Sequence, residues 1–121
     1  MGDQGSVLIV EDEAALAELF EIWLSDRYTV ETATTGAAAI DRLDDTIDVI
    51  VLDWRMPDIS GADVLAHIRA EGVPVDVAVV TGMELVVEDL EHESATVLCK
   101  PVSAEELVST VDSLMDGPDS E

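Results

Sequence analysis

Short apolar runs alternate along this chain with longer stretches in which apolar residues recur every three or four positions. The short runs are rich in valine and isoleucine, which is typical of strands buried on both faces of a parallel sheet. They predict five strands, over residues 6–10, 28–33, 49–52, 75–80 and 96–99. The longer stretches are typical of amphipathic helices. They predict five helices, with apolar stripes within residues 16–24, 37–43, 62–70, 85–91 and 107–114.

Residues that favour helix starts precede several of these stretches. Thr35 comes just before the second predicted helix, where its hydroxyl can accept a hydrogen bond from the first turn. Ser60 with Asp63, and Ser103 with Glu106, have the three-residue spacing of a capping box. The helix starts are therefore indicated by local chemistry as well as by periodicity.

Strands and helices alternate along the whole chain, with short connections between them. This alternation predicts an α/β fold with a doubly wound, five-stranded parallel sheet of the flavodoxin-like (βα)5 type and helices on both faces. A length of 121 residues is that of one domain. We expect residues 1–116 to form this domain and residues 117–121 to be a tail or the start of a linker.

The predicted third strand is the element around which the candidate chemistry gathers. It ends in Asp53, and Met56-Pro57 then interrupts regular structure. The carboxyl ends of parallel strands line the crevice where ligands bind in open α/β sheets. Polar residues also follow three of the other predicted strands. Glu11 and Asp12 follow the first strand, Thr81 follows the fourth and Lys100 follows the fifth. We expect all of these side chains at one edge of the sheet.

Three carboxylates at one edge need a partner of opposite charge. Two carboxylates 4 Å apart repel by about 4 kcal/mol at an effective dielectric constant of about 20. Mg²⁺ is a hard cation that prefers oxygen ligands, so it suits a cluster of Glu11, Asp12 and Asp53. Together with Lys100, the only lysine of the chain, one Mg²⁺ would balance the three negative charges. The sequence therefore predicts a magnesium site.

These residues resemble the pattern of the receiver domain of two-component response regulators. The resemblance covers nearly the whole chain. It rests on the acidic pair Glu11-Asp12, the segment from Asp53 to Met56-Pro57, the strand-ending Thr81, and the step Lys100-Pro101. Each motif alone is weak, but all of them occur here in the order found in the family.

The resemblance implies a metal-dependent phosphorylation site. Asp53 would accept a phosphoryl group from a phosphohistidine of a sensor histidine kinase. Asp12 and Asp53 would bind Mg²⁺ directly, the backbone carbonyl of Arg55 would be a third protein ligand, and Glu11 would hold a metal-bound water. These roles fit phosphoryl transfer, which depends on positioning and on neutralisation of oxygen charge.

The resemblance also assigns the residues that hold the transferred group. Lys100 would contact its oxygens and Thr81 would donate a hydrogen bond to it. The protein would then catalyse its own phosphotransfer and a slow autodephosphorylation, without being a classical enzyme. In this family the Lys-Pro bond is cis, which the resemblance predicts for Lys100-Pro101.

Two features depart from the family pattern. Receiver domains usually carry an aromatic residue three positions before the lysine, where this chain has Val97. The segment from Thr81 to Lys100 is also shorter than usual, so we expect a short or irregular fourth helix. Met83, two positions after Thr81, would border the phosphorylation site. These departures affect the expected output surface and leave the phosphorylation residues in place.

The charge balance limits the partners of this domain. The chain has 28 acidic and 5 basic residues, a formal charge of −23. This field repels phosphate backbones, so we expect no direct nucleic-acid binding. One interpretation of this charge is a generic acidic surface. The other, which we favour, is that the protein comes from a halophilic archaeon, because concentrated salt screens the repulsion between its acidic residues. A hydrophobic share of 48% argues against disorder, and with no membrane span or leader we expect a cytoplasmic protein.

Individual side chains invite simple assignments. Phe20 and Trp23 have the helical spacing of core residues. Trp54, next to the acceptor, is interpreted either as a partly exposed gate at the crevice rim or as a tolerated surface aromatic. The single Cys99 excludes an internal disulfide. We expect it to be a small core residue rather than a redox sensor.

Two other functions are compatible with the predicted fold. The first is a receiver-like protein-interaction module that does not use phosphorylation; Thr81, Lys100 and the acidic pair favour the phosphorylated alternative. The second is a flavodoxin-like electron carrier, which the acids Glu11-Asp12-Glu13 exclude because they would repel the FMN phosphate. The sequence leaves open the cognate kinase, an output domain or downstream protein, and a homodimer.

Overall fold

The computed structural model describes residues 5–56, 59–82 and 96–116. The strands are β1 (Ser6–Val10), β2 (Thr29–Ala33), β3 (Val49–Asp53), β4 (Asp76–Thr81) and β5 (Thr96–Cys99). The helices are α1 (Ala14–Leu24), α2 (Gly36–Arg42), α3 (Gly61–Glu71) and α5 (Ala104–Asp116). The helix predicted within 85–91 and the tail predicted at 117–121 lie outside the described residues.

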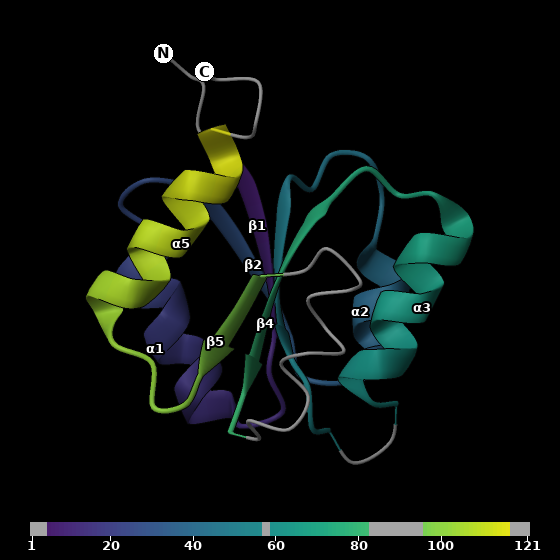
Figure 1. The fold of residues 1–121 in the computed structure, drawn as a ribbon, viewed down its shortest axis with the longest axis horizontal. Helices are drawn as coiled ribbons and strands as arrows, with labels where there is room; N and C mark the ends of the chain where they lie inside the picture. The colour runs from purple at the N-terminus through teal and green to yellow at the C-terminus, as the bar shows by residue number, and fades with distance from the viewer. Residues whose placement is uncertain (1–4, 57–58, 83–95, 117–121) are drawn as a thin grey trace.

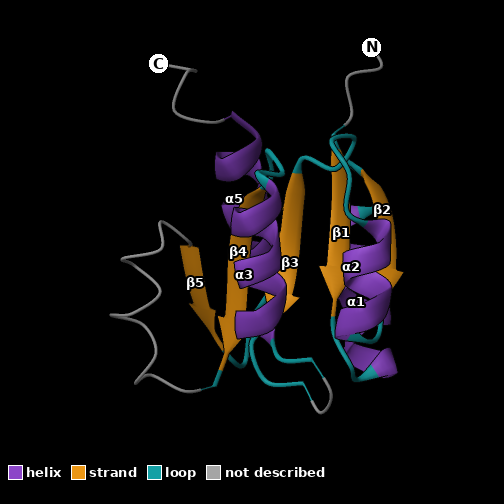
Figure 2. Ribbon diagram, turned by 90° about the vertical axis from the view of Figure 1, so that its right-hand side faces the viewer, coloured by secondary structure: helices purple, strands orange, loops and turns teal. Residues whose placement is uncertain are grey.

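The strands form one parallel sheet in the order β2-β1-β3-β4-β5. This is the strand order of flavodoxin-like doubly wound sheets. Helices α1 and α5 cover one face, and α2 and α3 cover the other (Figure 1). Figure 2 shows the sheet face-on, with β2 and β5 as its outer strands. The predicted fold class is confirmed.

The core has one apolar layer on each face of the sheet. All of β3 is buried, and its side chains alternate between the layers: Ile50 and Leu52 pack toward α2 and α3, while Val49 and Val51 pack toward α1 and α5. Burying an aliphatic or aromatic side chain of this size stabilises the fold by about 1.5–3 kcal/mol. The central strand is thereby held on both faces and along both edges.

The helix starts follow the predicted capping chemistry. The hydroxyl of Thr35 accepts a backbone N–H of the first turn of α2 at 3.0 Å. Ser60 and Asp63 form a complete capping box at the start of α3. Ser103 and Glu106 exchange the same pair of hydrogen bonds before α5. No helix in the described ranges combines the length and apolar character needed to cross a bilayer.

Two assignments of apolar side chains need correction. Cys99 is exposed rather than part of the core, because it ends β5, an outer strand that pairs only with β4. Trp23 is only partly buried, whereas Phe20 on the same helix is 1% exposed. The two rings lie 5.7 Å apart between centroids, and Trp23 packs against the outside of the core layer. Helical spacing identified the correct face of α1 but not its depth.

Candidate functional site

The polar strand ends lie at one edge of the sheet. Glu11 directly follows β1, Asp53 ends β3, Thr81 ends β4, and Lys100 directly follows β5. In the parallel sheet these strands are consecutive neighbours, so their carboxyl ends lie side by side. The backbone N–H of Lys100 donates to the carbonyl of Thr81 at 2.9 Å, which fixes the last two strand ends together. The predicted convergence is therefore present.

The three carboxylates form a compact group. Oxygen atoms of Glu11, Asp12 and Asp53 all lie within 4.8 Å of one another. Glu11 is 1% exposed and Asp53 is 3% exposed, whereas Asp12 faces solvent. The group thus extends from the interior of the protein to its surface, which gives a small ligand a route of entry.

Lys100 supplies the positive charge of this group. Its Nζ lies 3.4 Å from Oδ1 of Asp53 and 3.7 Å from Oε1 of Glu11. The lysine side chain is one-third exposed, so its ammonium group is partly hydrated while the carboxylates beneath it are not. One cation for two buried carboxylates leaves the site with excess negative charge.

Burial changes the acidity of both inner carboxyl groups. Desolvation raises the pKa of Glu11 to about 7, and nearby Asp53 adds to this, while the backbone N–H of Glu13 and the charge of Lys100 oppose it. Desolvation also raises the pKa of Asp53, with a further contribution from its hydrogen bond with Asp12, against the lowering effect of Lys100. Without a metal, burial therefore disfavours the ionisation of both carboxyl groups at once.

The donor set fits a small divalent cation. Oε2 of Glu11 accepts the backbone N–H of Glu13 at 3.2 Å, but its Oε1 is buried without a hydrogen-bond partner. The Nζ of Lys100 lies 3.7 Å from this oxygen, beyond hydrogen-bond distance, so a closer cation or a water molecule would lower the cost of burying it. Carboxylate oxygens are the ligands that Mg²⁺ prefers. Glu11, Asp12 and Asp53 thus have the chemistry of a magnesium site.

The structure gives the positions of three other predicted site residues, but it leaves some of their predicted roles untested. Thr81 is buried at the end of β4, one strand away from Asp53. Arg55 lies two residues after Asp53 with an exposed side chain, and the metal-binding role of its carbonyl stays a prediction. Trp54 is partly buried against the core, and its role as a gate also stays a prediction. Met83 lies outside the described residues.

The bond between Lys100 and Pro101 is cis. This agrees with the geometry implied by the resemblance to receiver domains. Val97 is partly buried and packs against the core layer beneath α2 and α3. The position usually held by an aromatic residue is therefore occupied by a smaller apolar side chain.

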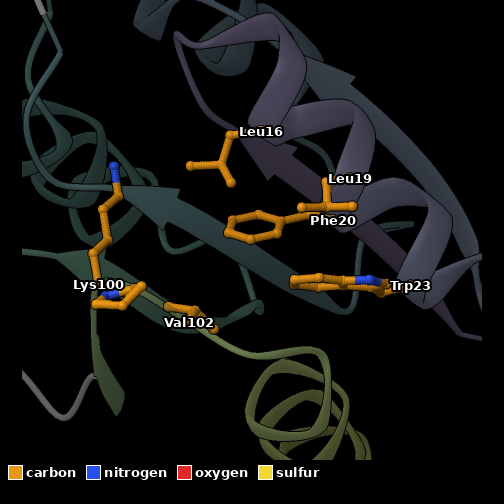
Figure 3. A pocket seen from close by; sticks show the side chains of 7 residues that line it. Leu16, Leu19, Phe20, Trp23, Lys100 and Val102 are labelled. Atoms are coloured by element: carbon orange, nitrogen blue, oxygen red, sulfur yellow. The ribbon is translucent and has the colours of Figure 1, made fainter.

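An apolar groove lies beside Lys100 and was not anticipated from the sequence. It has a volume of about 520 Å³ and runs between α1 and the start of the segment that leads to α5 (Figure 3). Its walls are formed by Leu16, Leu19, Phe20, Trp23, Lys100, Pro101 and Val102. Leu19 is 40% exposed, and Ile22 on the same helix is 65% exposed. The sequence signal for this groove is the apolar stripe on α1, which is wider than the sheet can cover.

Comparison with protein families identifies this arrangement. A family model described as the response regulator receiver domain matches residues 7–112. A candidate transcriptional regulator of Haloferax volcanii is 44% identical over 110 residues, which cover 90% of this chain and 19% of that protein. Haloferax is a halophile, so the relationship to halophilic archaea that the charge predicts is confirmed.

Bacterial relatives extend the comparison. The cell cycle response regulator CtrA of Brucella ovis is 32% identical over 115 residues, covering 90% of this chain and 49% of CtrA. The chain thus spans about a fifth of the Haloferax protein and about half of CtrA.

Solved structures share the fold. The signal receiver domain of a candidate LuxO repressor protein from Vibrio parahaemolyticus has a TM-score of 0.85 and 31% identity, covering 93% of this chain and 91% of that one. The response regulator protein TrrA from Thermotoga maritima, in complex with Mg(2+)-BeF, has a TM-score of 0.81 and 28% identity. That comparison covers 92% of this chain and 99% of TrrA.

Proposed function

This chain belongs to the response regulator receiver domain family, and on that basis we propose that it accepts a phosphoryl group on Asp53 during two-component signalling. The observation that carries the proposal is the position of Asp53. It is buried, its oxygen lies 3.4 Å from the ammonium of Lys100, and it shares a group of oxygens within 4.8 Å with Glu11 and Asp12. An acceptor next to both a cation and a candidate metal site suits phosphoryl transfer.

The donor in this proposal is a phosphohistidine of a sensor histidine kinase. An oxygen of Asp53 forms a new bond to phosphorus as the bond from phosphorus to the imidazole nitrogen breaks, and the imidazole keeps the electron pair. Lys100 contacts the phosphoryl oxygens, which bring about −1.5 to −2 units of charge. The Thr81 hydroxyl donates a hydrogen bond to one of them.

The metal ion in this proposal is Mg²⁺. Asp12, Asp53 and the backbone carbonyl of Arg55 would hold the ion, and Glu11 would accept a hydrogen bond from a water bound to it. When bound, Mg²⁺ neutralises the charge on the phosphoryl oxygens and orients them. The complex of the related TrrA with Mg(2+)-BeF supports this assignment, since that protein shares the fold of this chain.

The apolar groove beside Lys100 supports a protein as the donor. Small phosphodonors need only reach Asp53, but a protein must also bind near it. The exposed Leu19 offers apolar contact area in the groove that Lys100 also lines. We expect Leu19→Ser to slow transfer from a phosphorylated kinase that is active on the wild type, and to leave phosphorylation by acetyl phosphate unchanged.

Mass spectrometry tests the central claim. Incubation with acetyl phosphate and Mg²⁺ should add the mass of one phosphoryl group, and peptide mapping should locate it on Asp53. Asp53→Asn should take up none. Asp76→Asn is a matched control, because Asp76 is an exposed aspartate at the opposite end of a neighbouring strand. Phosphate found on another residue of the wild type would contradict the proposal.

The alternative is a receiver-like interaction module that does not use phosphorylation. Val97 favours this alternative, because it is a small side chain at the position where receiver domains usually carry an aromatic residue. A wild-type protein that neither takes up phosphate nor binds Mg²⁺ with beryllofluoride would support this alternative. Uptake on Asp53 would exclude it.

A further inference from the structure

Two glycines lie where the chain leaves the acceptor strand. Gly61 is the first residue of α3, and its N–H donates to the carbonyl of Trp54 at 3.0 Å. Gly36 is the first residue of α2, and its backbone lies against Ile59. Both glycines are buried. Among the described glycines only Gly72 has a positive φ, so neither is needed for an unusual backbone conformation.

The requirement at Gly61 is one of space. A Cβ atom there would lie 2.6 Å from the carbonyl oxygen of Asp53 and 2.7 Å from the Cα of Trp54. Both are backbone atoms, which cannot rotate away as the end of a side chain can. A methyl group at position 61 must therefore displace either the start of α3 or the peptide that follows the acceptor carboxylate.

Neither side of this contact yields easily. The backbone N–H of Trp54 donates to the carbonyl of Val80 at 3.0 Å, and Asp53 pairs in register with the same residue of β4. On the other side, the capping box and buried side chains such as Val64 fix α3. A displacement at Gly61 is therefore transmitted to the acceptor peptide.

Gly36 makes a second contact of this kind, farther along the same connection. A Cβ atom there would lie 2.5 Å from the Cβ and 2.7 Å from the carbonyl oxygen of Ile59. Ile59 lies between Arg55 and the start of α3, and its side chain packs against the core. Gly36 thus sets how closely Ile59 approaches α2.

We propose that Gly61 and Gly36 are positioning residues: they hold Trp54 and Ile59 in place so that Asp53 and the carbonyl of Arg55 keep the spacing of a magnesium site. This inference rests on the proposed function. It assigns the two glycines to metal affinity rather than to stability alone. Mg²⁺ requires near-ideal octahedral geometry, so small displacements of its ligands weaken binding.

Calorimetric titration with Mg²⁺ tests this inference on the whole chain. Gly61→Ala should raise the dissociation constant for Mg²⁺ about tenfold or more, the usual scale for disturbed support of a metal ligand. Gly36→Ala should raise it several-fold. Phosphorylation by acetyl phosphate at limiting Mg²⁺ should slow in the same order, with partial recovery at saturating Mg²⁺.

Gly72→Ala is the matched control. Gly72 ends the same helix that Gly61 begins, its φ is +65°, and a Cβ atom there would meet nothing within 4 Å. The substitution should lower the melting temperature through backbone strain and leave the dissociation constant for Mg²⁺ within about twofold of wild type. A purely structural role of Gly61 and Gly36 would give the same result as this control.

The outcomes separate the two claims. If the wild type binds Mg²⁺ and the folded variants at 61 and 36 bind it within twofold of wild type, the positioning role is wrong and the proposed function stands. If Gly61→Ala does not fold, Gly36→Ala decides alone, because the atoms nearest to its added methyl group belong to Ile59 rather than to the peptide that follows Asp53. A wild type that binds no Mg²⁺ would overturn both claims.

Discussion

The ammonium nitrogen of Lys100 lies 3.4 Å from an oxygen of Asp53, although the two residues come from strands separated in the sheet by β4. The same ammonium is 3.7 Å from Glu11. Two buried carboxylates therefore depend on one partly hydrated cation. Their balance determines how the domain responds to loss of the lysine, to pH and to metal.

Loss of the lysine should destabilise the metal-free protein. Removing one partner from buried ionic groups leaves uncompensated charge. Because Lys100 is one-third exposed, we expect Lys100→Gln to lower the free energy of unfolding by about 1–3 kcal/mol at pH 8. Urea denaturation followed by circular dichroism measures this change. Lys100→Arg, which keeps the charge, should lose less; equal denaturation midpoints for wild type and Lys100→Gln would contradict the prediction.

The raised pKa of Glu11 predicts a loss of stability as the pH rises. Between the ordinary value of 4.5 and about 7, the folded protein keeps a proton that the unfolded chain has released. The corresponding stabilisation is complete below pH 4.5 and is lost by about pH 7, amounting to at most about 3 kcal/mol.

Denaturation at several pH values in metal-free buffer measures this effect. Glu11→Gln should flatten the decline between pH 4.5 and 7, because an amide does not titrate. Added Mg²⁺ should restore stability at pH 7 and above, since it favours the ionised carboxylates. Equal slopes of stability against pH for wild type and Glu11→Gln across this interval would contradict the prediction.

Trp54 should report on the acceptor beside it. In a Trp23→Phe variant, Trp54 is the only tryptophan, and it is partly buried next to Asp53. Its fluorescence should change when Mg²⁺ and beryllofluoride are added together. Asp53→Asn in the same background should not respond to beryllofluoride. An unchanged spectrum, in a protein that takes up phosphate, would contradict the role of Trp54 as a gate.

Salt should stabilise the folded protein. At a formal charge of −23, self-repulsion acts over a distance that falls from about 30 Å in 0.01 M salt to about 3 Å in 1 M salt. We expect the melting temperature to be about 10 °C or more higher in 2 M KCl than in dilute buffer, which corresponds to roughly 2 kcal/mol. Sucrose at equal osmolality controls for effects unrelated to charge. Equal melting temperatures in KCl and dilute buffer would exclude halophilic adaptation.

Most of the fold and the site follows from where apolar runs stop. In a parallel sheet every strand points the same way, so a polar residue that ends a strand must lie at the common edge. Asp53, Thr81 and Lys100 could be assigned to one crevice for this reason. The predicted strand boundaries agree with the structure to within one residue, and the predicted helical stripes agree with the helix bounds to within three residues, wherever both can be compared.

Depth within the fold could not be read in the same way. Glu11 and Asp12 are adjacent acids in the sequence, yet one is buried and the other faces solvent. Cys99 is expected in the core because a free cysteine behaves as a small apolar residue, but its exposure depends on β5 being an outer strand. The exposure of Trp23 and the presence of the groove depend on how closely α1 and α5 pack. These properties arise from strand order and helix packing, which local patterns do not specify.

Because Lys100 is the only lysine, an acylating reagent has a single side-chain amine to attack in the entire molecule. That amine is partly open to solvent and in contact with the acceptor carboxylate. Its rate of labelling can therefore serve as a footprint of the crevice, with an occupied crevice shielding the amine and an empty one leaving it open to the reagent.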